Sequence, residues 1–164
     1  MSERSPINGV VITVSDSSFN GERADKSGPA VVSRLLESGY EILDLIVVPD
    51  ERETIAATLR NQAGRLGSGI LVTTGGTGIT PRDITPEATR EVIEKEIPGF
   101  SELMRTKGLA STRNAVLSRA VSGILGGVLI VNLPGSTRGA VESLDAILDL
   151  VPHVLDLING RTGH

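Results

Sequence analysis

Four short runs of apolar, mostly β-branched residues recur along the chain, separated by longer segments with helical spacing. Within each run, apolar and polar positions hardly alternate. That pattern is typical of strands covered on both faces of a parallel sheet. We therefore predict four buried strands at Val10–Val14, Ile42–Val48, Ile70–Thr74 and Val128–Leu133.

Apolar residues recur every three to four positions in the segments between these runs, which predicts helices. Thr85 is expected to cap one helix, because Pro86 follows at the first helical position. Pro152 is expected to kink the last helix. The predicted helices run from Ser27 to Gly39 with Val31, Val32, Leu35 and Leu36 inward, from after Asp50 through Ile55, Leu59 and Leu66, from Thr85 through Val92 and Ile93, from Pro98 to Gly108, and from about Arg138 to Asn159.

Alternating strands and helices imply right-handed crossovers and an open, mostly parallel sheet. With 164 residues and neither a linker nor an internal repeat, residues 1–164 are expected to form one α/β domain.

Composition narrows the possible functions. Aromatic residues make up 2% of the chain, the net charge is −4, and no run of Lys or Arg occurs, so we expect no nucleic-acid partner. The absence of cysteine excludes disulfides and thiolate sites. No apolar run approaches the ~20 residues that span a bilayer, and no signal sequence is visible, so we expect a cytoplasmic protein with no membrane partner.

The residues with candidate chemistry follow the predicted strands. Ligands of such sheets bind outside the carboxyl ends of the strands, so these segments are expected to form one crevice. They are Ser15-Asp16-Ser17 with the loop to Asp25-Lys26-Ser27-Gly28, Pro49-Asp50-Glu51, Gly75-Gly76-Thr77-Gly78 with Pro81-Arg82-Asp83, and Pro134-Gly135-Ser136.

Each of these motifs also has a structural interpretation. The Gly75–Gly78 stretch fits either a phosphate-binding loop or a tight turn, and it matches neither a dinucleotide fingerprint nor a P-loop. Asp50 fits either a helix cap or a catalytic group. Asp83 lacks an evident structural role if Thr85 is the cap, whereas Arg82 fits a phosphate clamp or a solvated charge. Ser118-Arg119 fits a polar loop or a ligand contact.

Two carboxylates at neighbouring strand ends can together hold Mg²⁺, which prefers one or two carboxylates plus waters and substrate phosphates. Asp50 and Asp83 are the candidates. Glycine-bound phosphates, Mg²⁺ and nearby cations are the components of a phosphoryl- or nucleotidyl-transfer site.

Several motifs together resemble the MogA/MoaB family of molybdenum-cofactor biosynthesis, which includes the gephyrin G domain. They are TTGGTGITPRDITPEAT, VVPDE, ADKSGP, IPGFSELMR, LSRAVSGI and VNLPGS, and the resemblance extends from about Ile7 to Leu157.

The resemblance implies a compact three-layer α/β/α sandwich, a homotrimer and a molybdopterin adenylyltransferase. Such an enzyme transfers AMP from Mg-ATP to molybdopterin and releases pyrophosphate, and a molybdenum insertase can act downstream. By the same resemblance, Asp50 and Asp83 are the catalytic and metal-binding positions. The ligand-binding positions are Ser15, Asp16, Gly75, Gly76, Thr77, Gly78, Arg82, Ser118, Arg119, Pro134, Gly135 and Ser136.

Some MoaB-type members lack the aspartate of the PDE motif and resemble non-catalytic proteins. This chain has both aspartates, which favours the enzyme. The alternative is a MoaB-type module that binds molybdopterin or a protein partner without turnover. The absence of an insertion after Ser136 leaves the chain between the MogA and MoaB branches.

Overall fold

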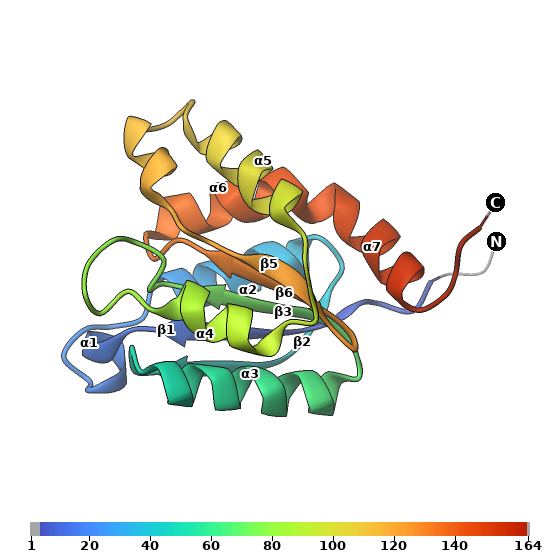
Figure 1. Cartoon of the computed structure of the whole chain (residues 1–164), viewed down its shortest axis with the longest axis horizontal. Helices are drawn as coiled ribbons and strands as arrows, with labels where there is room; N and C mark the ends of the chain where they lie inside the picture. Colours follow the sequence, from blue (N-terminus) through green and yellow to red (C-terminus); the bar gives the residue numbers. More distant parts are fainter. Residues whose placement is uncertain (1–3, 164) are drawn as a thin grey trace.

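Six strands form one sheet in the order β2-β1-β3-β6-β5-β4 in the computed structural model, which describes residues 4–163 (Figure 1). The first four strands of that order are parallel, and β5 and β4 add an antiparallel edge. The strands are β1 (Asn8–Val14), β2 (Glu41–Val48), β3 (Ser68–Thr74), β4 (Lys95–Glu96), β5 (Ser122–Leu125) and β6 (Gly127–Leu133).

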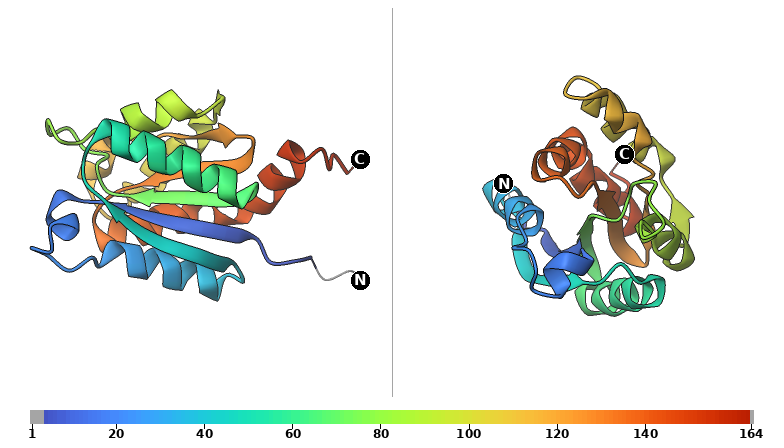
Figure 2. Two further views of the ribbon diagram at one scale, coloured as in Figure 1. Left: turned by 90° about the horizontal axis from the view of Figure 1, so that it is seen from below. Right: turned by 90° about the vertical axis from the view of Figure 1, so that its left-hand side faces the viewer.

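Helices cover both faces of this sheet, which confirms the three-layer α/β/α sandwich (Figures 1 and 2). The helices α2, α5, α6 and α7 pack on one face, and α3 and α4 pack on the other. Their bounds are α1 (Asp16–Phe19), α2 (Ser27–Glu37), α3 (Arg52–Leu66), α4 (Thr85–Val92), α5 (Pro98–Gly108), α6 (Thr137–Ile147) and α7 (Val151–Ile158), with short 3-10 helices η1 (Arg113–Leu117) and η2 (Leu148–Leu150).

The four predicted strands are confirmed as β1, β2, β3 and β6. Their aliphatic side chains form two apolar cores, because consecutive residues of a strand point to opposite faces. Val11, Ile70 and Leu129 pack in one core, and Ile12 and Leu71 pack in the other. The sequence did not predict β4 and β5, which are short, and β4 consists of two charged residues.

The prediction that β2 is covered on both faces is wrong. β2 is an edge strand, and the side chains of Leu43 and Leu45 are 55% and 36% exposed. Leu36 on α2 also points outward, at 53% exposure, because only Val31, Val32 and Leu35 face the sheet. An apolar run therefore marked the strand correctly but not its position at the edge of the sheet.

The last predicted helix is two helices. α6 ends at Ile147, η2 follows, and α7 begins at Val151 with Pro152 in its first turn. Proline is favoured in the first turn, where its missing N–H leaves no hydrogen bond unmade. Pro152 therefore lies in the first turn of α7, and the interruption that the sequence predicted near this residue takes the form of a break at η2, directly before it.

A polar network crosses the interior close to the carboxyl ends of the strands. The fully buried Asn132 amide donates to the hydroxyls of Thr73 and Thr89 at 3.0 Å each, and its oxygen accepts from the amide of Val121. β3, β6 and α4 are thereby fixed beside the loops that follow them. Among the described residues, no helix combines the length and apolar character needed to cross a membrane.

Candidate active site

Two adjoining cavities lie at the carboxyl ends of the parallel strands, where the sequence predicted one crevice. We call them the apolar cavity, about 500 Å³, and the polar cavity, about 560 Å³. Both sizes are typical of small-molecule sites. Four residues line both cavities and so mark their junction: Gly76, Asp83, Gly135 and Ser136.

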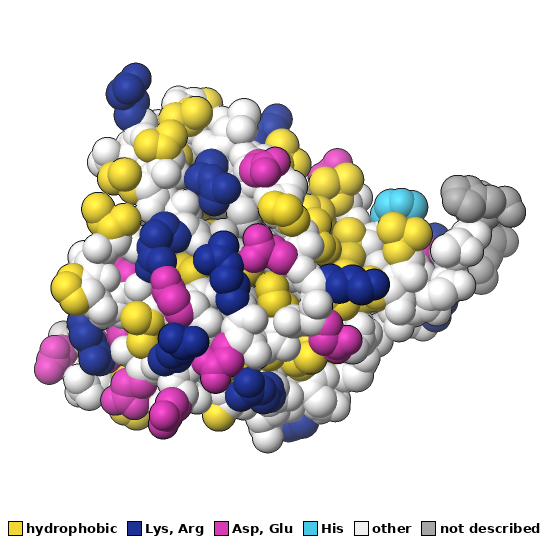
Figure 3. All heavy atoms as spheres, viewed as in Figure 1, with side chains coloured by type: hydrophobic (Ala, Val, Ile, Leu, Met, Phe, Trp, Pro, Cys, Tyr) yellow, Lys and Arg dark blue, Asp and Glu magenta, His cyan; other side chains and the backbone are white. Residues whose placement is uncertain are grey.

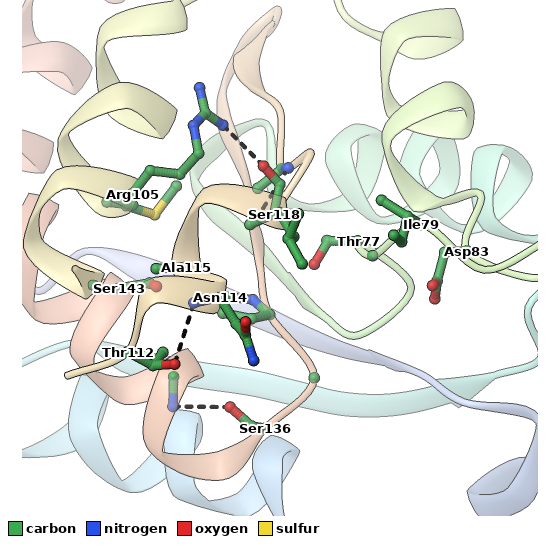
Figure 4. Close-up of a pocket in the computed structure, with 18 of the residues that line it drawn as sticks. Thr77, Ile79, Asp83, Arg105, Thr112, Asn114, Ala115, Ser118, Ser136 and Ser143 are labelled. Carbon is green, nitrogen blue, oxygen red and sulfur yellow. Dashed lines mark hydrogen bonds between the residues drawn. The ribbon is translucent and has the colours of Figure 1, made fainter.

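The apolar cavity lies between the loop that follows β3 and the helices α5, η1 and α6. Figure 4 shows Thr77, Ile79 and Asp83 on one side, with Arg105 and Ser118 across from them. Arg105 donates to the backbone oxygen of Ser118 at 3.3 Å. The apolar part of the lining comes from Ile79, Met104, Ala115, Leu117, Ala120 and Pro134.

The polar cavity lies between the ends of β1, β2 and β3 and the start of α2. Asp50 and Asp83 line it together with the glycine turn after β3. The loop between α1 and α2 contributes Arg23, Ala24, Asp25 and Lys26, and the first residue of α2 contributes Ser27.

The glycine turn brings the chain close to its neighbours. Gly75 and Gly76 have φ angles of 104° and 68°, a region that side chains disfavour. A Cβ on Gly75 would overlap the backbone oxygen of Val14, and one on Gly76 would overlap the Thr85 hydroxyl and lie 3.1 Å from Asp50 Oδ1. The tight-turn interpretation is thus confirmed, and the turn also lies beside the Asp50 carboxylate.

Asp50 is held by a reciprocal pair of hydrogen bonds with Asp16. The amide of Asp16 donates to Asp50 Oδ2, and the amide of Asp50 donates to Asp16 Oδ1, each at 2.9 Å. Arg82 donates from two nitrogens to the Asp16 carboxylate at 3.0 and 2.9 Å. The cap interpretation of Asp50 is wrong, because Glu51 is the N-cap of α3 and the Asp50 carboxylate turns to Asp16 instead.

The pKa of Asp50 is raised above its ordinary value. Burial is the largest cause, and the negative charges of Asp16 and Asp83 raise the pKa further. The hydrogen bond from the Asp16 backbone and the charge of Arg82 act in the opposite direction. Burial and the two neighbouring carboxylates thus both disfavour the ionised form of Asp50, and a bound cation would favour it.

Asp83 has a structural role that the sequence did not reveal. Its Oδ2 accepts from the amide and the hydroxyl of Thr80, at 2.9 and 2.8 Å, and so closes the turn before α4. The prediction that Thr85 caps α4 is wrong. Ile84 is the N-cap, and the buried Thr85 hydroxyl donates to the backbone oxygen of Gly75 at 3.0 Å.

Arg119 holds the loop between β3 and α4. Its guanidinium donates to the backbone oxygens of Gly78 and Asp83, at 2.7 Å each, and pairs with Glu87. This hydrogen bond from Arg119 lowers the pKa of Glu87. Since all three guanidinium nitrogens have protein partners, the structure assigns Arg119 a role in shaping the loop.

The structure brings most of the predicted site residues together around the cavities. Asp16, Arg82 and Arg119 line neither cavity, so their direct contact with a ligand stays a prediction. The residues that do line a cavity are Ser15, Asp50, Gly75, Gly76, Thr77, Gly78, Asp83, Ser118, Pro134, Gly135 and Ser136.

The segment Asp25-Lys26-Ser27-Gly28, which the sequence placed at the crevice without assigning its residues a role, contributes Asp25, Lys26 and Ser27 to the polar cavity. Sequence reasoning missed one group of lining residues, although the IPGFSELMR motif contains its α5 members. This group comes from α5, the η1 segment and α6. It comprises Ser101, Met104, Arg105, Thr112, Asn114, Glu142 and Ser143.

Asp50 and Asp83 each have one carboxylate oxygen that is free to bind Mg²⁺. In each carboxylate Oδ2 accepts protein hydrogen bonds, whereas Oδ1 accepts none from residues 4–163. No group of three or more acidic or histidine side chains within that range could hold a metal by itself. An ion here would therefore need waters and substrate phosphates as further ligands, which is the usual coordination of Mg²⁺.

Comparison with known proteins gives a consistent result. The family model described as "Probable molybdopterin binding domain" matches residues 10–153. A molybdopterin adenylyltransferase of Helicobacter pylori is 41% identical over 158 residues, which covers 92% of this chain and 87% of that protein. The cinnamon molybdenum cofactor synthesis protein of Drosophila melanogaster is 40% identical over 150 residues, and the chain spans 25% of its length.

Solved structures agree with the sequence relatives. The molybdopterin biosynthesis enzyme MoaB of Thermus thermophilus superposes with a TM-score of 0.88 at 47% identity, covering 94% of this chain and 97% of that one. The tungsten cofactor synthesizing protein MoaB of Pyrococcus furiosus superposes with a TM-score of 0.85 at 37% identity, covering 95% and 99%.

Proposed function

The chain belongs to the family described as "Probable molybdopterin binding domain", and from this membership we propose that it is a molybdopterin adenylyltransferase. It would transfer AMP from ATP to molybdopterin and release pyrophosphate. The observation that carries the proposal is the junction of the two cavities, where Asp83 lines both and Asp50 lies alongside.

We assign the two substrates to the two cavities by their chemistry. The apolar cavity offers aliphatic walls with a few polar groups, which suits a planar pterin ring. The polar cavity combines the carboxylates of Asp25, Asp50 and Asp83 with the cations Arg23 and Lys26, which suits a nucleoside triphosphate with its metal. The phosphates of the two substrates then meet at Gly76, Asp83, Gly135 and Ser136.

The reaction at that junction is a displacement at phosphorus. A terminal phosphate oxygen of molybdopterin attacks the α-phosphorus of ATP and forms a new P–O bond. The bond from the α-phosphorus to the oxygen that bridges to the β-phosphate breaks, and pyrophosphate leaves with that oxygen. The chain contributes orientation and electrostatic stabilisation, which are the main sources of catalysis in phosphoryl transfer.

The free Oδ1 atoms of Asp50 and Asp83 are the groups that would hold Mg²⁺. When bound, the ion supplies positive charge to the phosphates and so weakens their repulsion of the attacking oxygen. Asp16 holds Asp50 in place through the reciprocal hydrogen bonds, and Arg82 fixes Asp16 in turn. Asp16 and Arg82 then support catalysis through Asp50.

The alternative is a module that binds molybdopterin without turnover. Asp50 and Asp83 both line the polar cavity, which favours the enzyme. The experiment is pyrophosphate release from Mg-ATP with and without molybdopterin. Release that requires molybdopterin supports the enzyme, whereas molybdopterin binding with no release supports the module.

We also propose that the chain forms a homotrimer, and predict a mass of three chains by sedimentation equilibrium at micromolar concentration. The support is the edge strand β2, which pairs only with β1 among residues 4–163 and exposes Leu43 and Leu45. An unpaired apolar edge is a site that proteins usually cover. A mass of one chain at that concentration would contradict the proposal.

The proposed product is an activated phosphate anhydride whose AMP group is ready to be displaced. The partner that consumes it would be a molybdenum insertase, and we place the protein in the cytoplasm, where ATP is available.

Apolar residues near the apolar cavity are exposed at the surface: Ile79, Val116 and Leu117 are 68%, 57% and 47% exposed. Figure 3 shows apolar side chains scattered over this face between charged ones, with the charged side chains densest in its lower part.

A further inference from the structure

Two cations on the loop between α1 and α2 line the polar cavity. Arg23 and Lys26 are both exposed, and neither belongs to an ion pair within residues 4–163. The cations that the sequence placed at the site are already committed, since Arg82 binds Asp16 and Arg119 binds Glu87. Arg23 and Lys26 are therefore the positive side chains of this cavity that can bind a ligand.

The first turn of α2 is fixed at the same wall of the cavity. Asp25 Oδ2 accepts from the Thr13 hydroxyl at 2.7 Å, and Oδ1 accepts from the Gly28 amide at 3.0 Å. A Cβ on Gly28 would overlap both Thr13 and Asp25, so the turn packs tightly against the end of β1. This packing fixes the position of the neighbouring Lys26.

Ser27 is the polar group that this arrangement leaves facing the cavity. It is only 7% exposed and lines the polar cavity, and no hydrogen bond joins its amide or hydroxyl to another of residues 4–163. Pro29 has no N–H, and the Gly28 amide is bound by Asp25, so Ser27 is the available donor of the turn. It stands at the amino end of an 11-residue helix, where the helix dipole favours anions.

We propose that Lys26, Arg23 and Ser27 bind the β- and γ-phosphates of ATP and hold the leaving pyrophosphate. This inference rests on the proposed adenylyl transfer. The cavity contains carboxylates at Asp25, Asp50 and Asp83 and cations at Arg23 and Lys26, so a polyphosphate chain is attracted to the cations. The Asp25 carboxylate accepts hydrogen bonds from Thr13 and Gly28. As the bond to the α-phosphorus breaks, negative charge grows on the oxygen that leaves with pyrophosphate, and cations placed there stabilise that charge.

The test compares ATP with AMP and pyrophosphate, the two products into which the reaction divides it. The affinities of AMP, pyrophosphate and ATP are measured by calorimetry with Mg²⁺ for the wild type, Lys26→Ala, Arg23→Ala and Lys26→Arg. Lys95→Ala is the matched control, because Lys95 is an exposed lysine on β4 that lines neither cavity. Melting temperatures confirm that each variant is folded.

Lys26→Ala and Arg23→Ala are each expected to weaken the binding of ATP and of pyrophosphate about tenfold or more, which is the effect of losing one charge-assisted hydrogen bond. The affinity of these variants for AMP should stay within about twofold of the wild-type value, because AMP lacks the β- and γ-phosphates. Lys26→Arg should retain most of the affinity. Equal weakening of AMP and ATP, or unchanged binding of pyrophosphate, would overturn the assignment.

The proposed function and this inference fail in different ways. If the wild type binds pyrophosphate through Lys26 but transfers no AMP, the assignment of the polyphosphate site holds and the adenylyltransferase is wrong. If the wild type transfers AMP and Lys26→Ala binds pyrophosphate as tightly as the wild type, the function holds and the inference is wrong. A wild type that binds neither ATP nor pyrophosphate overturns both.

Discussion

Asp50→Asn is expected to lower the rate of AMP transfer by roughly 10²- to 10³-fold, the loss typical of one electrostatic contact to a transition state. Asparagine has nearly the same shape, and its oxygen can still accept from the Asp16 amide. The change therefore removes the charge and keeps the geometry. Because Asp50 lines only the polar cavity, molybdopterin affinity should stay unchanged.

The same substitution should not destabilise the fold. The pKa of Asp50 is raised on folding, so its ionised form is less stable in the folded chain than in the unfolded chain. This cost is absent below the ordinary pKa of aspartate and is fully present once pH exceeds the raised pKa. Without Mg²⁺, the melting temperature of Asp50→Asn should equal or exceed that of the wild type at neutral pH, and the difference should shrink in acid.

Asp149→Asn provides the matched control, because it makes the same chemical change at an exposed residue that lines neither cavity. Its turnover should equal that of the wild type. If Asp50→Asn also retained wild-type turnover, Asp50 would have no part in the chemistry. If it lost turnover only together with a lower melting temperature, its role would be structural.

Asp83→Asn is expected to reduce AMP transfer by a similar factor, roughly 10²- to 10³-fold. The amide oxygen can still accept from Thr80, so the turn before α4 should persist. Asp83 differs from Asp50 because it lines both cavities. We therefore expect KM to rise for molybdopterin as well as for ATP, which initial rates at varied substrate concentrations would measure.

The double variant tests whether the two carboxylates act together. Groups that act as one unit show strongly non-additive effects, so the double variant should lose little more activity than either single variant. Losses that multiply would show that Asp50 and Asp83 act independently, which would contradict a shared metal site.

The apolar runs predicted the parallel part of the sheet, because short continuous runs of β-branched residues are typical of buried parallel strands. It did not reveal β4 and β5, since Lys95 and Glu96 form a strand only through pairing with Ile124 and Gly123. The position of β2 at the edge was equally invisible, because Leu43 and Leu45 look like core residues in the sequence. Long-range pairing decides both features.

Site residues on strand ends were predictable because the carboxyl ends of parallel strands meet at one edge. Their hydrogen-bond partners were not, because Asp50 meets Asp16 across 34 residues and Arg119 meets Asp83 across 36. Such contacts excluded the cap interpretation of Asp50 and showed that Arg119 holds the loop between β3 and α4. The wall formed by α5, η1 and α6 depends on how these helices pack.

The most direct test of the account follows the phosphorus atoms of ATP. The protein is incubated with Mg²⁺, molybdopterin and ATP labelled at either the α- or the γ-phosphorus, and the products are separated. We predict that the α-label appears on molybdopterin in an amount equal to the pyrophosphate released, and that the γ-label appears only in pyrophosphate. Transfer of the γ-label to molybdopterin, or release of the α-label as free AMP without molybdopterin, would contradict the account.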